Sequence, residues 1–207
     1  MKVLFATGNP AKVRHYGERL ADQGIEIVTL KDLGIEIDVD ESGKHPAENA
    51  VIKAEAYHMA SGLPTIAMDD GLFLDNLPEE LQPGTHVRRV DGKHLNDAEM
   101  IEHYIGLVDR FGCEGELRGY FLKGVAIATD EITYRHELKS PRCFSNQQSE
   151  KREEGYPLAS IQIIEPFQKF KSELTVEEEN IAMEEEFREI FSFIEETVKK
   201  IEGKLEK

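Results

Sequence analysis

The chain has 207 residues, of which 40% are hydrophobic and 32% are charged, and its 41 acidic and 25 basic residues give a formal net charge of −16. This length predicts a single domain over residues 1–207, and the hydrophobic fraction is sufficient for a core. The negative charge repels phosphate backbones and anionic lipid, which excludes a long nucleic acid or a membrane surface as partner. A small phosphorylated ligand stays compatible, because a few cations and a metal ion reverse the field locally.

Two features predict a soluble, cytoplasmic protein. No apolar run approaches the roughly 20 residues of a membrane span, and the apolar stretch within Met1–Pro10 is too short for a signal peptide. The two cysteines, Cys113 and Cys143, lie far apart without a C-x-x-C motif, which favours a reduced compartment. A disulfide between them is the less favoured alternative.

Strand and helix patterns follow one another along the first half of the chain. The apolar run Lys2–Ala6 leads directly into Thr7-Gly8-Asn9-Pro10, which predicts a buried strand that ends in a loop. The predicted elements after it are a helix over Ala11–Ala21, strands over Glu26–Leu30 and Ile35–Asp40, a helix over Ala47–Ser61, a strand over Thr65–Met68, a turn at Asp69–Gly71 and an extended segment over Leu72–Leu77.

The second half is richer in hairpin signals. Asn96-x-x-Glu99 and Thr175-x-x-Glu178 resemble capping boxes, and each predicts the start of a helix with an apolar face. Together with the first half, this pattern is typical of a mixed α/β fold. The other predicted elements are a hairpin of Tyr120–Thr129 and Ile132–Leu138, a mobile polar loop over Lys139–Gly155 and a strand over Leu158–Ile164.

The first motif that could carry chemistry is Thr7-Gly8-Asn9-x-x-Lys12. It joins a strand to a helix, and backbone N–H groups at a helix N-terminus attract anions. The Asn9 amide can donate a hydrogen bond, and Lys12 adds a positive charge. On spacing alone, an ordinary strand-to-helix connection that carries a surface lysine is the favoured interpretation, and a phosphate-binding loop is the alternative.

The second motif follows Glu41-Ser42-Gly43. Asn49 and Lys53 are four residues apart on a predicted helix, so they share one face. Glu48 lies in the first turn, where the helix dipole favours a carboxylate whether or not a metal binds there. A solvated surface position is the default expectation for Lys53.

The third and fourth motifs are Asp69-Asp70 and Pro83-Gly84-x-x-x-Arg88-Arg89. Adjacent carboxylates after a strand repel one another unless a divalent ion offsets them, and oxygen ligands suit Mg²⁺. A tight Asp-Asp-Gly turn explains the same residues equally well. An arginine could clamp phosphate oxygens, although a pair in a loop is more often a surface feature.

The order of the four motifs is more specific than any one of them. T-G-N-x-x-K, E-S-G-x-x-x-x-E-N-A-x-x-K-A, D-x-G-L-x-x-D-x-L and P-G-x-x-x-x-R, in this order over Met1–Val90, resemble the inosine triphosphate pyrophosphatase family. The resemblance implies an elongated, two-lobed α/β fold with a central twisted mixed sheet and a cleft between the lobes. It also implies a homodimer that acts on nucleoside triphosphates or related small nucleotides.

The resemblance further implies Mg²⁺-dependent hydrolysis between the α- and β-phosphates, which releases nucleoside monophosphate and pyrophosphate. By position, it implies that Lys12 and Lys53 hold phosphates and that Asp69 orients and deprotonates the attacking water. The other residues implied in substrate binding are Thr7, Gly8, Asn9, Arg89 and Tyr156, and those implied in metal binding are Glu48, Asp69 and Asp70.

Two regions depart from the family pattern. The family's Asp-Asp-Ser-Gly corresponds to Met68-Asp69-Asp70-Gly71, so that Met68 replaces the first aspartate and Asp70 the serine. A one-residue slip in the alignment instead matches the two aspartates to Asp69 and Asp70, with the serine deleted. The family's Gly-Phe-Gly-Tyr-Asp-Pro survives only as Gly155-Tyr156-Pro157, its Ser-His-Arg falls on Met183-Glu184-Glu185, and a family lysine falls on Glu179. Glutamates repel an acceptor oxygen of the base, so we expect an altered base preference. The alternative is a catalytically degenerate nucleotide-binding or regulatory protein of the same fold.

Overall fold

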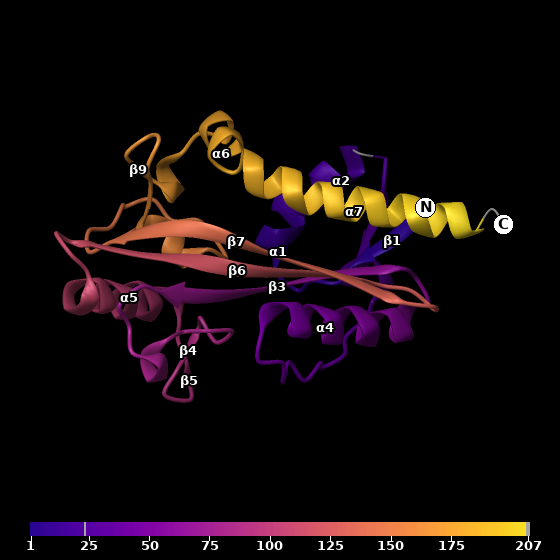
Figure 1. The fold of residues 1–207 in the computed structure, drawn as a ribbon, viewed down its shortest axis with the longest axis horizontal. Coiled ribbons are helices and arrows are strands. Elements are labelled where there is room, and N and C mark those ends of the chain that lie inside the picture. The colour runs from indigo at the N-terminus through magenta and orange to yellow at the C-terminus, as the bar shows by residue number, and fades with distance from the viewer. Residues whose placement is uncertain (23, 206–207) are drawn as a thin grey trace. The chain divides into compact units, whose positions relative to one another are not determined.

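A computed structural model describes residues 1–22 and 24–205 of the chain (Figure 1). A seven-stranded sheet has the strand order β2-β1-β3-β6-β7-β8-β9, and β4 and β5 form a separate ribbon. The bounds are β1 (Lys2–Phe5), α1 (Pro10–Lys12), η1 (Val13–Gly17), α2 (Glu18–Asp22), β2 (Glu26–Thr29), α3 (Leu30–Leu33), α4 (Pro46–Ser61), β3 (Thr65–Leu74), η2 (Glu79–Leu81), β4 (Arg89–Val90), β5 (Lys93–His94), α5 (Asp97–Phe111), β6 (Glu116–Ala128), β7 (Thr133–Ser145), η3 (Pro157–Ser160), β8 (Gln162–Ile164), β9 (Lys169–Phe170), η4 (Lys171–Glu173), α6 (Val176–Ala182) and α7 (Glu184–Leu205).

The sheet is mixed. Strand β1 pairs in parallel with both β2 and β3, whereas β8 pairs antiparallel with β7 and with β9. The predicted α/β class with a mixed central sheet is therefore confirmed. The chain divides into two compact units, which we describe separately: unit 1 comprises Met1–Asp70, Lys123–Leu138 and Glu186–Lys207, and unit 2 comprises Gly71–Leu122 and Lys139–Glu185.

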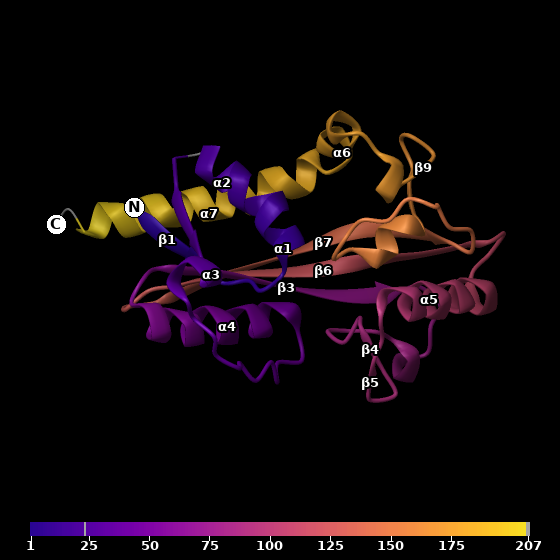
Figure 2. The same cartoon turned by 180° about the vertical axis from the view of Figure 1, so that it is seen from behind.

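In unit 1, helices cover both faces of the strands (Figures 1 and 2). On one face, Ala50 and Ala54 of α4 are fully buried against Leu4 of β1 and against alanines of β3 and β6. A Cβ atom at Gly124 would lie 2.4 Å from the Ala47 nitrogen, so this glycine lets the start of α4 touch the backbone of β6. The helix can approach this closely only because both surfaces carry small residues.

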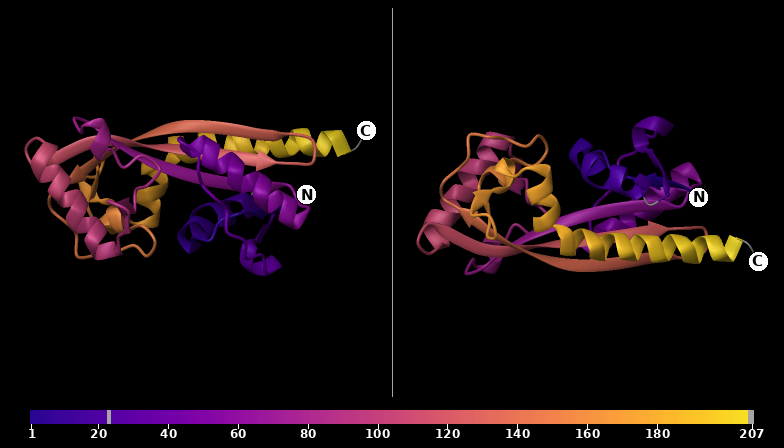
Figure 3. Two further views of the ribbon diagram at one scale, coloured as in Figure 1. Left: turned by 90° about the horizontal axis from the view of Figure 1, so that it is seen from below. Right: turned by 90° about the horizontal axis from the view of Figure 1, so that it is seen from above.

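Helix α7 covers the other face of unit 1 and runs along the β6–β7 hairpin (Figure 3). The ring of His136 stacks on that of Phe193 at 5.2 Å, and Tyr16 meets Phe187 edge to face at 5.9 Å. Each buried apolar side chain of α7 contributes about 1.5–3 kcal/mol to stability. The residues that form its buried stripe are Phe187, Ile190, Phe191, Ile194, Val198 and Ile201.

Unit 2 has its own apolar core, built around α5. The predicted capping box is confirmed: the Asn96 side chain accepts from the Glu99 backbone, and the Glu99 side chain accepts from the Asn96 backbone. Tyr104 is 1% exposed, and its hydroxyl donates to the Val87 carbonyl at 2.9 Å. The core residues are Leu72, Leu74, Leu77, Leu95, Met100, Ile101, Tyr104, Leu107, Val108, Leu117, Phe144, Leu158 and Ile161.

Three predicted elements differ in the structure. Residues 35–40 form neither helix nor strand, because they do not pair with the edge strand β2, and Ile37 is 40% exposed. The predicted turn at Asp69–Gly71 is wrong, since β3 runs without a break from Thr65 to Leu74. The predicted loop Lys139–Gly155 is wrong up to Ser145, which ends β7.

Smaller differences concern the helices and cysteines. The predicted first helix contains a π-helical segment, η1, between α1 and α2. The predicted strand Leu158–Ile164 begins with the 3₁₀ turn η3 before β8. Cys113 and Cys143 are both free, so the less favoured disulfide is absent between these two described residues. Within the described ranges, no helix is both long and apolar enough to cross a lipid bilayer.

Candidate active site

The two adjacent carboxylates, Asp69 and Asp70, lie in the part of β3 that belongs to unit 1. Successive side chains of a strand point to opposite faces. Asp69 therefore contacts Asn49 and Lys53 on the α4 face, whereas Asp70 contacts Lys12 and Lys123 on the other. The continuous strand thus separates two carboxylates that a turn would have kept together.

On the α4 face, both oxygens of Asp69 accept hydrogen bonds from one helix face. Lys53 Nζ lies 2.6 Å from Oδ1, and Asn49 Nδ2 donates to Oδ2 at 3.1 Å. Lys53 also reaches Glu41 Oε2 at 3.0 Å. Asn49 and Asp69 are 2% and 9% exposed, so this arrangement is held in the interior. The spacing of four residues between Asn49 and Lys53 places both on Asp69, as their shared helix face predicts.

A tight loop brings Glu41 toward this face. The Gly43 backbone donates to Asn49 Oδ1 at 2.8 Å, so the Asn49 amide joins the loop to the strand. A Cβ at position 43 would lie 2.6 Å from that same oxygen, which only glycine avoids. Burial opposes the charged form of Lys53, but the Asp69 and Glu41 carboxylates outweigh burial and raise the pKa of its ammonium. Lys53 is therefore a permanent cation at neutral pH.

On the opposite face, Asp70 lies between two lysines. Lys12 Nζ is 2.6 Å from Oδ2, and Lys123 Nζ is 3.1 Å from Oδ1. Lys123 also lies 3.4 Å from Glu186 at the start of α7. Burial disfavours the Asp70 carboxylate, but the two lysines outweigh it and hold its pKa well below the usual range. Asp70 is therefore a fully ionised, paired carboxylate.

The predicted phosphate loop directly follows β1. The Asn9 backbone donates to Thr7 Oγ1 at 3.1 Å, and the Val13 backbone donates to the Asn9 carbonyl at 3.2 Å, which starts the first helical turns. The parallel register of β1 and β3 pairs Phe5 with Ile66. The loop that follows β1 therefore begins beside the part of β3 that leads to Asp69 and Asp70. A Cβ at Gly8 would meet no atom within 4 Å, and this exposed glycine leaves its backbone open to a ligand.

The three carboxylates expected to bind a metal are not brought together. Glu48 is exposed in the first turn of α4, where its Oε2 accepts from the Lys44 backbone at 2.8 Å, and this bond lowers its pKa. Asp69 and Asp70 leave opposite faces of β3, and the described residues contain no group of three His, Cys, Asp or Glu side chains that could hold a metal ion. Mg²⁺ commonly takes only one or two protein carboxylates together with substrate phosphates, so the donor chemistry of Asp69 or Glu48 suits the ion without such a group.

Two expected substrate-binding residues belong to unit 2. Arg89 is exposed on β4, whereas its neighbour Arg88 pairs with Asp97 at 2.6 Å. The Lys171 ammonium lies over the ring of Tyr156, 5.3 Å from the ring centroid. Lys171 also pairs with Glu153 at 3.0 Å and with Glu179 at 3.1 Å.

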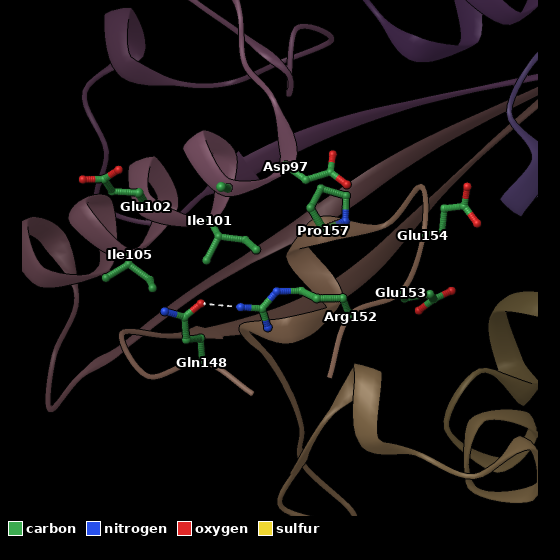
Figure 4. A pocket seen from close by; sticks show the side chains of 10 residues that line it. Asp97, Ile101, Glu102, Ile105, Gln148, Arg152, Glu153, Glu154 and Pro157 are labelled. Atoms are coloured by element: carbon green, nitrogen blue, oxygen red, sulfur yellow. Dashed lines mark hydrogen bonds between the residues drawn. The ribbon is translucent and has the colours of Figure 1, made fainter. Parts of the chain in front are cut away.

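Unit 2 also contains a pocket of about 750 Å³ between α5 and residues 148–157 (Figure 4). Arg152 donates to Gln148 at 2.8 Å in its wall. The carboxylates of Asp97, Glu102, Glu153 and Glu154 line the same space. This acidic lining is unsuited to the phosphates of a nucleotide.

No motif in the sequence points to Lys123 or Glu186 as part of the site, and none connects Glu41 with Lys53. Lys123 and Glu186 lie 53 and more residues from Asp70 along the chain, and no spacing pattern joins them. The Glu41-Ser42-Gly43 motif did point to the loop, but only the fold shows that it closes over Lys53.

Comparison with known proteins tests the family resemblance independently of the site geometry. The model of the Ham1 family matches residues 3–140. The chain is 41% identical over 101 residues to a protein of Yersinia pseudotuberculosis named dITP/XTP pyrophosphatase, an alignment that covers 49% of this chain and 50% of the relative. The chain thus spans about half the length of the curated relatives it matches.

Two solved structures resemble the whole fold. A HAM1 protein from Coxiella burnetii superposes with a TM-score of 0.72 at 22% identity, over 93% of this chain and 99% of the other, and it supports the fold alone. A nucleoside-triphosphatase / dITP/XTP pyrophosphatase from Mycobacterium abscessus gives 0.69 at 26% identity, over 93% and 98%. Because the family model covers well over half of the residues and the four motifs lie inside it, the chain belongs to the Ham1 family, and the resemblance predicted from those motifs is confirmed.

Proposed function

We propose that the protein is a Mg²⁺-dependent nucleoside-triphosphate pyrophosphatase, which adds water across the α–β phosphoanhydride bond to give nucleoside monophosphate and pyrophosphate. The observation that carries this proposal is the buried Asp69 carboxylate held by Asn49 and Lys53 beside the loop that follows β1. The names of relatives such as the Yersinia pseudotuberculosis dITP/XTP pyrophosphatase support the reaction class.

In the proposed mechanism, Asp69 orients the attacking water and accepts its proton at a carboxylate oxygen. Asn49 and Lys53 hold the Asp69 carboxylate in one orientation, because they engage separate oxygens. Lys12 and Lys53 offset the charge that develops on the phosphates, and the loop of Thr7, Gly8 and Asn9 positions them through backbone N–H groups.

Mg²⁺ would be held by the carboxylates of Asp69 and Glu48. When bound, this ion would neutralise phosphate oxygens and raise the acidity of nearby water. Asp70 is better suited to a different role, because it leaves the opposite face of β3, where Lys12 and Lys123 contact it.

Several finer features belong to the same proposal. We expect a base preference different from the family's, since Glu179, Glu184 and Glu185 stand where the resemblance implies a lysine and donor groups. Arg89 and Tyr156 would contact the nucleotide outside the reacting phosphates. We also propose one domain over residues 1–207, a homodimer and a cytoplasmic location.

The test is a pyrophosphate-release panel over standard, deaminated and modified nucleoside triphosphates with Mg²⁺. We expect at least one triphosphate to be cleaved, and Asp69→Asn to lower kcat by about 10²–10⁴, the range for loss of a general base. The matched control is Asp130→Asn, at an exposed hairpin residue that pairs only loosely with His58 at 3.3 Å. Full activity of the Asp69→Asn variant would show that Asp69 is not the general base.

The second candidate is a nucleotide-binding protein without turnover, which the Met68 replacement and the paired state of Lys12 favour. Thermal stabilisation by a nucleoside triphosphate with no product formed from any member of the panel would identify it.

A further inference from the structure

Lys12, Asp70, Lys123 and Glu186 form a chain of alternating charges in unit 1, which we call the lysine–aspartate chain. Its members come from α1, β3, β6 and α7, so four separate elements converge on it. The exposed fractions of the side chains are 13%, 25%, 14% and 9% in this order. Salt screens an ion pair so shielded from water only weakly. Its charges therefore interact more strongly than those of a pair on the surface.

Asp70 already pairs with the ammonium group of Lys12, which an anionic ligand would need. Lys12 Nζ lies 2.6 Å from Asp70 Oδ2 and donates a longer bond to the Met68 carbonyl at 3.4 Å. The ammonium has three N–H donors, and these two contacts engage two of them. A phosphate that binds Lys12 through more than one oxygen must therefore take over the Asp70 contact, because a carboxylate and a phosphate oxygen compete for the same donors. The cost of ligand binding therefore includes the release of Lys12 from Asp70.

Lys123 determines how costly this release is. It holds the second oxygen of Asp70 at 3.1 Å, so a carboxylate that loses Lys12 keeps one cationic partner. Without Lys123, release of Lys12 would deprive this shielded carboxylate of both cations that contact it within the described part of the chain, and such an uncompensated charge is strongly unfavourable. The two residues therefore act on Lys12 in opposite directions.

We infer that Asp70 is an internal competitor of the phosphate ligand for Lys12, and that Lys123 limits the strength of this competition. This inference rests on the proposed function, in which Lys12 holds a phosphate. Asp70 and Lys123 are positioning residues here, since both act through the Lys12 ammonium rather than on the substrate. They would determine how tightly the site binds a polyanion.

The experiment measures binding of inorganic pyrophosphate by calorimetry, in the presence of EDTA, to the full chain and its variants. We expect Asp70→Ser to bind about tenfold more tightly and Lys123→Met about tenfold more weakly than the wild type, within the range of couplings between contacting charges. In the Asp70→Ser background, Lys123→Met should have no further effect, because the competitor is gone. Asp70→Asn, which keeps the shape of the side chain, replaces the serine variant if that one does not fold.

Thermal unfolding separates this role from a structural one. Loss of a shielded ion pair should lower the Tm of both single variants, while their affinities for pyrophosphate move in opposite directions. The matched control pair is Glu26→Gln and Lys2→Met, because these residues form an exposed ion pair at 3.6 Å in the same unit. Neither control should change the affinity, since the pair lies on the surface.

Two results would overturn the inference: unchanged or weaker pyrophosphate binding by folded Asp70→Ser and Asp70→Asn, or equal weakening by Lys123→Met with and without Asp70. The second result would mean that Lys123 contacts the ligand itself. Failure of the proposed function gives a different pattern, in which the wild type releases no pyrophosphate from any triphosphate, or Lys12→Met binds pyrophosphate as well as the wild type does.

Discussion

At the scale of single residues, Asn49 connects three parts of the candidate site. Its amide nitrogen donates to Asp69 at 3.1 Å, while its amide oxygen accepts from the Gly43 backbone at 2.8 Å. Asparagine alone supplies a donor and an acceptor of this size, whereas aspartate would offer two acceptors. The residue is 2% exposed, so its own amide group cannot replace these partners with water.

We therefore predict that Asn49→Ala lowers kcat/KM by about 10–100-fold and destabilises the fold by about 1–3 kcal/mol, because the Gly43 N–H and one Asp69 oxygen lose their partner. Steady-state pyrophosphate release and urea unfolding measure the two effects. The matched control is Asn146→Ala, which removes an exposed bond to Asp109 of 2.8 Å and should change stability by less than about 0.5 kcal/mol. Unchanged kinetics in Asn49→Ala would show that Asp69 needs no such support.

At the scale of elements, the contact between α4 and β6 fixes the position of Asn49 and Lys53 over β3. Gly124 is the point of closest approach, since a Cβ there would lie 2.4 Å from the Ala47 nitrogen and from the Pro46 carbonyl carbon. Both obstacles are backbone atoms, which cannot move aside as a flexible side chain does. The helix as a whole would have to shift, and Asn49 and Lys53 would shift with it.

We predict that Gly124→Ala destabilises the protein by about 1–3 kcal/mol, the usual cost of overpacking, and lowers the rate of pyrophosphate release. The matched control is Gly106→Ala in α5, where an added Cβ meets no atom within 4 Å. Alanine in an exposed helix position should instead stabilise by about 0.5–1 kcal/mol. Chemical denaturation distinguishes the two signs, and a stable, fully active Gly124→Ala would contradict the role of this contact.

At the scale of the whole molecule, the net charge of −16 is unevenly distributed. Residues 173–207 contain 12 acidic and five basic residues, whereas the lysines of the candidate site lie elsewhere in the sequence. Surface ion pairs contribute about 0–1 kcal/mol each, so their screening costs little. Repulsion among the excess carboxylates opposes the compact state over longer distances, and salt screens it effectively.

We predict that the Tm rises by a few degrees between about 10 and 150 mM NaCl, as the Debye length falls below roughly 10 Å. Differential scanning calorimetry at constant pH measures this shift. Sucrose at matched osmolality is the control, because it stabilises without screening charge. A Tm that falls with added salt would mean that the ion pairs outweigh the net repulsion.

Local patterns in the sequence sufficed for much of the fold. The capping boxes at Asn96 and Thr175 form as predicted, because a cap depends on residues within one helical turn. The apolar stripe of α7 is buried as its spacing predicts. Ile35–Asp40 shows the limit of such patterns: alternation fits a strand, but a strand also needs a neighbour that the local sequence does not specify.

By itself, the sequence determined the α/β class and the family, and it pointed to Lys12, Lys53, Asp69 and Asp70, because these depend on motifs within short segments. Only the tertiary structure decided how those residues are divided between the two faces of β3. The continuous β3 sends Asp69 to Asn49 and Lys53, and sends Asp70 to Lys12 and Lys123. The physical reason is that side-chain direction follows from the backbone, and whether Asp-Asp-Gly turns or extends depends on pairing with strands far away in the chain.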